Sequence, residues 1–242
     1  MLSIWLAVAA IALVAFTTEG AIGFGGTIIA ASLGAQVVPL PVLLPAFVVV
    51  NLVLSAWLLG RGWNAIAWGL LGREVAPPVA VGAAVGLALF HVANTAVLIV
   101  AFGAFITALA VFQLVRPGGE LGRGPRIALL VIGGIAHGIF GTGGPMIVYV
   151  VRRRLPDKRA FRATLAVLWI VLNLALVVNF GSAGLYVAPT GTAIIVLALT
   201  IVPGLVLGDW IHHRLAADKF ERAVWLLLLV AGAALVLRQL VA

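Results

Sequence analysis

Two ionisable residues, Glu19 and His137, stand in stretches that are otherwise apolar or rich in glycine, and they are 118 positions apart. Inside a membrane a charged side chain costs ~2.5 to 3.5 kcal/mol on insertion scales, so each residue is a candidate for function. We expect Glu19 to act in coupling or gating, because a carboxylate would repel an anionic ligand unless it were protonated. His137 suits a proton carrier or a direct partner of an anion. The structural alternative puts Glu19 near a water-exposed helix end and makes His137 an interior hydrogen-bond donor.

A glycine motif follows each of these residues. The segments Gly23-Phe24-Gly25-Gly26-Thr27 and Gly141-Thr142-Gly143-Gly144-Pro145 have three glycines in the same register. Where a helix begins after such a break, its free N–H groups and its dipole favour an anion, and glycine lets the ligand approach closely. Glycines can equally serve close helix packing, which is our interpretation for isolated ones such as Gly103 and Gly232. The candidate substrate-binding residues are Gly25, Gly26, Thr27, Thr142, Gly143, Gly144 and His137.

Weaker candidates for lining a pathway are Asn51, Trp169 and Asn173, which fall within apolar runs. Such asparagines can also simply join neighbouring helices, at ~0.6 kcal/mol per hydrogen bond. Most other tryptophans, Trp63 and Trp68 among them, flank apolar runs and are typical of interfacial anchors. We expect no catalytic residue, metal or cofactor, because the chain has no cysteine and no metalloprotease or serine-hydrolase motif.

The composition indicates which elements must position these residues. Of 242 residues, 64% are hydrophobic and only 9% are charged, where a soluble domain has about 25% charged residues. A soluble globule of this size would need a polar surface that so few charges cannot supply. The sequence therefore predicts an all-α polytopic membrane protein.

Apolar runs divide the chain into long spans and short arms. Six runs have the ~20 residues that a membrane-crossing helix needs. Four shorter runs form two pairs, each joined by one of the glycine motifs, and their returning arms are too short to cross as helices. Each pair is therefore a re-entrant hairpin or a broken helix pair. The long runs are Leu40–Gly60, Val75–Val92, Thr95–Val115, Ala160–Phe180, Val187–Leu207 and Ala223–Ala242, and the short ones are Leu2–Thr18, Thr27–Val38, Ile127–Phe140 and Pro145–Val151.

Basic residues orient the chain. The net charge is +8, and all Lys and Arg except Arg238 fall in four connections, a pattern typical of cytoplasmic loops rather than of nucleic-acid binding. With this orientation the first glycine-broken pair starts outside the cell and the second starts inside. Our interpretation of the basic segment Arg152–Arg162 is that it sets the topology of the chain and contacts anionic lipid headgroups. The alternative is that it concentrates an anionic substrate at the cytoplasmic mouth.

The glycine motifs belong to an internal repeat. Gly20 and Gly138, like Gly86 and Gly204, also pair at an offset of 118. Each half, residues 1–118 and 119–242, contains one broken pair followed by three full spans. Because an odd number of crossings separates the halves, the second is inverted relative to the first. Inverted repeats around discontinuous helices are a recurring plan of secondary transporters.

The paired glycine motifs, at the start of each half of a small polytopic protein, resemble those of the TauE/SafE sulfite exporter family. The resemblance covers essentially the whole chain, although Thr27 stands where family members often carry a third glycine. It implies transport of sulfite or a related small organosulfur anion across the cytoplasmic (inner) membrane.

The leading hypothesis is a secondary transporter of small anions that works by alternating access, with proton coupling through Glu19. An anion channel of the same fold and a membrane assembly or scaffold protein are the alternatives, and an enzyme is not expected. The expected partners are a small anion and the lipid bilayer, without nucleic acid, and a homo-oligomer is left open.

Overall fold

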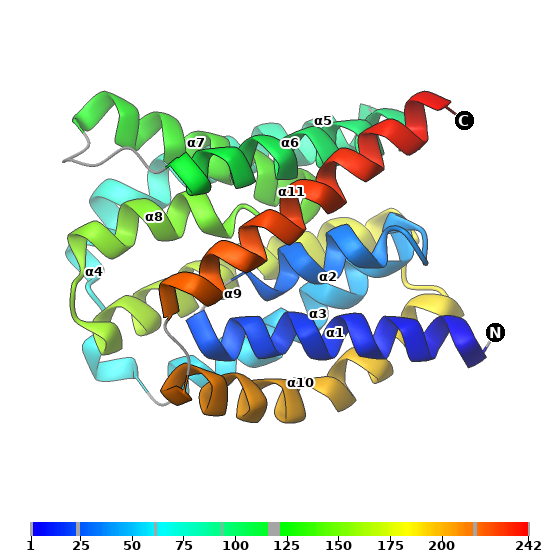
Figure 1. Ribbon diagram of the computed structural model, residues 1–242. Helices are drawn as coiled ribbons and strands as arrows, with labels where there is room; N and C mark the ends of the chain where they lie inside the picture. Colours follow the sequence, from blue (N-terminus) through cyan, green and yellow to red (C-terminus); the bar gives the residue numbers. More distant parts are fainter. Residues whose placement is uncertain are drawn as a thin grey trace. The chain divides into compact units, whose positions relative to one another are not determined.

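The computed structural model describes residues 2–22, 25–60, 62–92, 94–115, 122–214 and 217–241, and these residues form helices without strands (Figure 1). Seven of the described helical segments are long and apolar enough to cross a membrane. They are Leu2–Ala21, Leu40–Gly60, Trp68–Val92, Ala96–Val115, Arg159–Ser182, Ala188–Ile211 and Arg222–Gln239. The predicted all-helical, multi-pass architecture is therefore confirmed.

The chain forms two compact units, each built from both halves of the sequence. The first unit comprises Met1–Ala46, Ala93–Gly119 and Tyr186–Ala242. Within it, α1 runs along α10, α6 runs along α11, and the short α2 folds back on α1. Its helices are α1 (Leu2–Ile22), α2 (Gly26–Gly34), α6 (Thr95–Val115), α10 (Ala188–Arg214) and α11 (Ala217–Val241).

The second unit comprises Phe47–Val92 and Glu120–Leu185. Its largest contact is between α5 and α7, and α8 folds back on α7. The helix α3 (Leu40–Gly60) enters this unit two residues after its internal Pro45. The other elements are η1 (Trp63–Ala65), α4 (Trp68–Leu70), the π-helical turn η2 (Leu71–Val75), α5 (Ala76–Val92), α7 (Arg123–Phe140), α8 (Gly144–Arg154) and α9 (Lys158–Ser182).

Glycines permit the closest helix contacts in both units. In the first unit, a Cβ atom on Gly20 of α1 would lie only 3.1 Å from the Cα atom of Gly208 of α10. In the second, a Cβ atom on Gly138 of α7 would lie 2.9 Å from the Cα atom of Gly86 of α5. Side chains at these positions would force the helix backbones apart, so these glycines serve packing.

The isolated glycines Gly103 and Gly232 also pack as the sequence indicates. A Cβ atom on Gly103 of α6 would lie 2.8 Å from the carbonyl oxygen of Gly232 of α11. The two glycines thus bring the backbones of α6 and α11 together.

Helix lengths differ from the apolar runs at their charged ends. α1 continues through Glu19 and Gly20 to Ile22 and becomes long enough to span, whereas the sequence predicted a shorter arm ending at Thr18. α7 begins at Arg123 instead of Ile127. Hydropathy marks where a helix is apolar, but the backbone can stay helical through a polar or charged residue.

Both returning arms are short, as predicted. α2 has 9 residues and α8 has 11, which corresponds to about 14 and 17 Å of helix against a ~30 Å hydrocarbon core. Of the residues used in the sequence argument, Gly23, Phe24, Arg61 and Arg116 lie outside the described residues.

Candidate functional site

The second glycine break is a tight turn between α7 and α8. Gly141 has φ 65, in the left-handed region that favours glycine, and its N–H donates to the carbonyl oxygen of His137 at 2.7 Å. α8 then begins at Gly144, after Gly143, and no side chain caps it. The first N–H groups of a helix have no acceptor within that helix, so those of Gly144 and Met146 remain available, while Pro145 has none.

His137 lies on the last turn of α7, beside this break. Its side chain is 3% exposed and its ring stacks on that of Trp169, with ring centroids 5.5 Å apart and an angle of 16° between the planes. The side chain of Asn173 lies beside the ring. In the described part of the chain, neither ring nitrogen has a hydrogen-bond partner of ordinary geometry. A buried imidazole without fixed partners can donate to a ligand or exchange a proton.

Thr142, inside the break, carries a second unpartnered polar atom. The residue is 2% exposed and its Oγ1 finds no hydrogen-bond partner among the described residues. A buried hydroxyl without a partner costs roughly 1 to 3 kcal/mol, so native proteins seldom keep one without a reason. Thr142 and His137 thus offer two polar groups to whatever occupies the space beside the break.

One face of α9 lines this break. Trp169, Asn173 and Leu176 follow each other at helical spacing, with Trp169 and Asn173 beside His137 and Leu176 beside Gly141. The structure therefore brings together His137, Thr142, Gly143, Gly144, Trp169 and Asn173 of the predicted set.

The two glycines before α8 have different surroundings. A Cβ atom on Gly143 would collide with the carbonyl oxygen of Gly133, so Gly143 is needed for α7 and α8 to pack. A Cβ atom on Gly144 would meet only the ring of Trp169, at 4.0 Å. A methyl group would therefore fit at Gly144, beside the ring of Trp169.

The first glycine break differs from the second in its local geometry, because its left-handed glycine directly precedes the returning helix, where Gly143 of the second break has φ -75. Gly25 has φ 94, and α2 begins at the buried Gly26 without a side-chain cap. The carboxyl group of Glu19 lies directly on Gly26, where even a Cβ atom would collide with Oε2. That Oε2 atom is buried without a hydrogen-bond partner in the described part of the chain. Thr27, in the first turn of α2, is half-buried.

The predicted residues divide between the two units. Gly25, Gly26, Thr27 and Glu19 belong to the first unit, and the other predicted residues belong to the second. Asn51 is half-buried on α3, one helical turn beyond Val48, which lies beside Gly141. Its role in lining a pathway stays a prediction.

Sequence reasoning overlooked Thr17, whose buried Oγ1 also lacks a partner among the described residues. The signal was present, because Thr17 and Thr18 directly precede Glu19 in an apolar run. Thr18 is different, since its Oγ1 donates to the carbonyl oxygen of Val14 at 2.9 Å.

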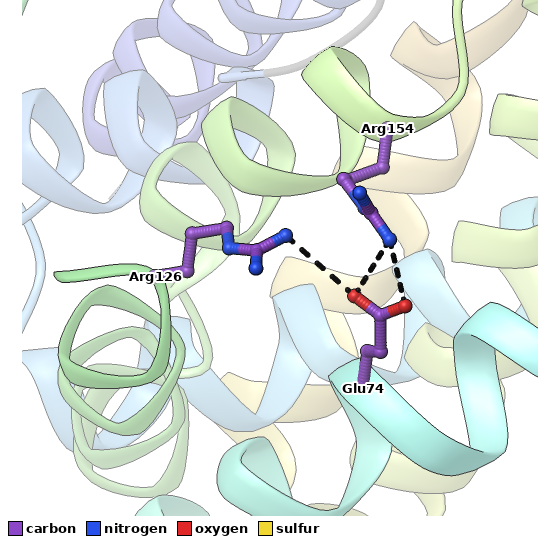
Figure 2. A network of polar contacts seen from close by, with 3 residues as sticks. All are labelled: Glu74, Arg126 and Arg154. Atoms are coloured by element: carbon purple, nitrogen blue, oxygen red, sulfur yellow. Dashed lines mark hydrogen bonds and ion pairs between the residues drawn. The ribbon is translucent and has the colours of Figure 1, made fainter. Parts of the chain in front are cut away.

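Sequence reasoning also overlooked Glu74, which lies on η2 and joins two arginines from other helices (Figure 2). Arg154 of α8 donates from Nη2 to both carboxylate oxygens, at 2.7 and 3.0 Å, and Arg126 of α7 lies 3.7 Å away. Glu74 could have been noticed, because it directly follows Arg73 in a connection that was assigned to the cytoplasm by its arginines.

Among the described residues, no three His, Cys, Asp or Glu side chains gather in a way that could hold a metal ion. The pair His212 and His213 has side chains outside the described set.

Comparison with known proteins gives two matches. The family described as "Sulfite exporter TauE/SafE" matches residues 8–235. A protein of Comamonas testosteroni, named "Probable inner membrane transporter protein TsaS", is 28% identical over 181 residues, which cover 73% of this chain and 75% of that protein. No solved structure matches the chain.

Proposed function

Because the chain belongs to the sulfite exporter TauE/SafE family, we propose that it is a secondary transporter that moves sulfite or a related small organosulfur anion across the inner membrane. Three observations support this. The family covers nearly the whole chain, the related protein is named as an inner membrane transporter, and seven described helical segments are long and apolar enough to span.

The observation that carries the proposal is the set of unpartnered polar groups at the break between α7 and α8. Thr142 Oγ1 and both ring nitrogens of His137 are buried without hydrogen-bond partners of ordinary geometry among the described residues, with the Asn173 side chain beside the imidazole, next to the uncapped N-terminus of α8. A small oxyanion accepts several hydrogen bonds at once and is favoured by a helix N-terminus. A hydroxyl, an imidazole N–H and the N–H of Gly144 would together hold such an anion.

The pattern of helix contacts supports inverted repeats. α1 packs mainly on α10 in the first unit, and α7 packs mainly on α5 in the second. The first helix of each half thus packs on the corresponding helix of the other half. Gly138 contacts Gly86 in the second unit, and in the first unit Gly20 contacts Gly208 while Gly204 contacts Phe16. Gly20 and Gly138 correspond at the offset of 118, as do Gly86 and Gly204. Two repeats related by a two-fold axis would exchange partners in this way.

Alternating access by rocking requires a place where a helix can bend. α3 passes from one unit to the other just after Pro45, which has no N–H to donate within the helix. We assign this position as the hinge and Glu19 as the coupling group, because protonation of Glu19 would remove a negative charge beside Gly26.

Two threonines of the second unit provide the test. Thr142→Val keeps the shape and removes the unpartnered hydroxyl, so the protein should be as stable or more stable, since no hydrogen bond within the protein is lost. If the hydroxyl binds the anion, kcat/KM for uptake should fall by roughly ten- to a hundredfold, as for a hydrogen bond to a charged group. The measurement is uptake of sulfite, thiosulfate and sulfoacetate into proteoliposomes, with and without a proton gradient.

Thr164→Val is the matched control. Thr164 is 1% exposed, but its Oγ1 accepts a hydrogen bond from the N–H of Ala67 at 2.9 Å. This variant should lose stability and keep its flux per folded molecule. Flux unchanged by Thr142→Val would remove the site from the break, and flux that never saturates with substrate would indicate a channel instead.

A further inference from the structure

A cavity of about 460 Å³ lies within the second unit, between η2, α5, α7 and α8. Four arginines line it, Arg73, Arg123, Arg126 and Arg154, and the only acidic side chain among its lining residues is that of Glu74. Glu74 neutralises at most one of the four positive charges. The cavity therefore has an excess of three positive charges and attracts an anion.

Only two of the four arginines in the cavity pair with Glu74. Arg126 and Arg154 both contact Glu74, as Figure 2 shows. Arg73 and Arg123 are exposed, and neither forms a hydrogen bond or ion pair with another described residue. α7 also begins at Arg123, so its first N–H groups and the positive end of its dipole add to the same potential.

The rest of the lining is apolar. The apolar lining residues are Leu70 of α4, Val75 of η2, Pro78 of α5, Ile127 and Leu130 of α7, and Val150 of α8. A small hydrophilic oxyanion would use the arginines but not these side chains. A molecule with a phosphate at one end and a hydrocarbon chain at the other would use both.

The position of the cavity suits a lipid. Trp63 and Trp68 lie just before η2, are largely exposed, and contact each other edge to face with ring centroids 6.3 Å apart. Exposed tryptophans beside the end of a spanning helix are typical of the membrane–water interface. The arginines are therefore at the level of lipid headgroups, where basic pockets between helices bind anionic lipids.

We propose that this cavity binds an anionic phospholipid, with Arg73 and Arg123 holding the phosphate and the apolar side chains of α5, α7 and α8 contacting the first part of an acyl chain. Glu74 competes with the phosphate for Arg126 and Arg154. The lipid site does not depend on which substrate is transported.

The experiment uses the full chain purified in a neutral detergent. Binding of phosphatidylglycerol is measured by native mass spectrometry and by the rise in melting temperature, with phosphatidylcholine, inorganic phosphate and sulfite in parallel. Arg73→Gln and Arg123→Gln change exposed side chains, so neither should affect folding. Each should weaken phosphatidylglycerol binding about fivefold, which corresponds to ~1 kcal/mol per arginine near a lipid surface.

Arg222→Gln is the control, because Arg222 is an exposed arginine of α11 that does not line the cavity and lies outside the basic segment Arg152–Arg162. It should leave binding unchanged, and Glu74→Gln should strengthen binding by freeing two arginines. The proposal is overturned if Arg222→Gln weakens binding as much as the cavity variants do, since the attraction would then come from the overall positive charge and not from the cavity. It is equally overturned if phosphate or sulfite stabilises the protein as well as phosphatidylglycerol does, or if phosphatidylcholine binds as tightly.

Discussion

Glu19 and His137 occupy matching positions next to the two glycine breaks, yet their chemistry differs. Glu19 presents a buried, unpartnered carboxyl oxygen to Gly26, whereas His137 presents an imidazole between Trp169 and the turn before α8. An imidazole can donate to an anion in its neutral form, but a carboxylate can do so only after it takes up a proton. This difference favours anion contact for His137 and coupling for Glu19, as proposed above.

The coupling role can be tested by Glu19→Gln, which keeps the shape of the side chain and removes its proton exchange. We expect anion flux to become independent of the proton gradient, while membrane insertion is retained. The measurement is proteoliposome uptake at two external pH values. Glu74→Gln is the control, because that carboxylate is about half exposed and paired with arginines, and its variant should keep the pH dependence. A Glu19→Gln protein with the wild-type response to the gradient would rule out this role.

The two glycines before α8 give a second test at the scale of single residues. Gly144→Ala adds a methyl group that meets only Trp169 at 4.0 Å. The free energy of unfolding should therefore change by no more than about 0.5 kcal/mol, and the melting temperature should change little. Because the methyl group occupies space beside the N–H donors, uptake should fall at least about tenfold, or ~1.4 kcal/mol. Gly143→Ala should instead lower the melting temperature, since its methyl group would collide with Gly133. Normal uptake by a stable Gly144→Ala protein would contradict the proposed site.

At the scale of helices, the contact between α5 and α7 depends on glycine. A Cβ atom on Gly138 would lie 2.8 Å from the amide nitrogen of Leu87 and 2.9 Å from the Cα atom of Gly86. Gly138→Ala should therefore destabilise the protein by about 1 to 3 kcal/mol, as overpacking does. The same substitution at Gly124, on the same helix but with nothing within 4 Å, should be neutral or stabilising by up to about 1 kcal/mol. Thermal unfolding in detergent measures both, and equal melting temperatures would show that the α5–α7 contact can relax.

The elements were predictable where apolar sequence alone decides them. Leu40–Gly60 and Thr95–Val115 were predicted with the bounds that α3 and α6 have. The helical segment that begins with α4 at Trp68 was not predicted from that residue. Arg73 and Glu74 interrupt the apolar run, although the backbone stays helical through them. Charged residues at the interface are compatible with a helix or a loop, and composition cannot distinguish the two.

The site was predictable as a list of residues but not as an arrangement. The glycine breaks and Thr142 follow from the motif, since glycine after an apolar run ends a helix and threonine can donate. The stacking of His137 on Trp169, and the ion pair of Glu74 with Arg154, join residues far apart in sequence. No spacing rule relates such positions, so these contacts required the folded chain.

At the scale of the whole molecule, inverted repeats make a prediction about topology. The chain has no cysteine, so a membrane-impermeant maleimide would label only a cysteine introduced by substitution. Ser3→Cys, at the start of α1, should react in intact cells. Gly122→Cys, just before α7, should react only after the membrane is permeabilised. Reaction of both residues from the same side would exclude the inverted arrangement.

The pairing of α1 with α10 has a consequence for how the protein is made. α1 ends at Ile22 and α10 ends at Arg214, so at 5 to 20 residues per second the ribosome completes the partner of α1 roughly 10 to 40 seconds later. α5 and α7 are separated only by a helix and short connections, and their contact can form within a fraction of that time. During the delay, α1 must remain in the bilayer with Gly20 uncovered by α10. Assembly of the first unit is therefore the late step of biogenesis, during which α1 is the segment most exposed to quality-control proteases and most in need of a membrane insertase.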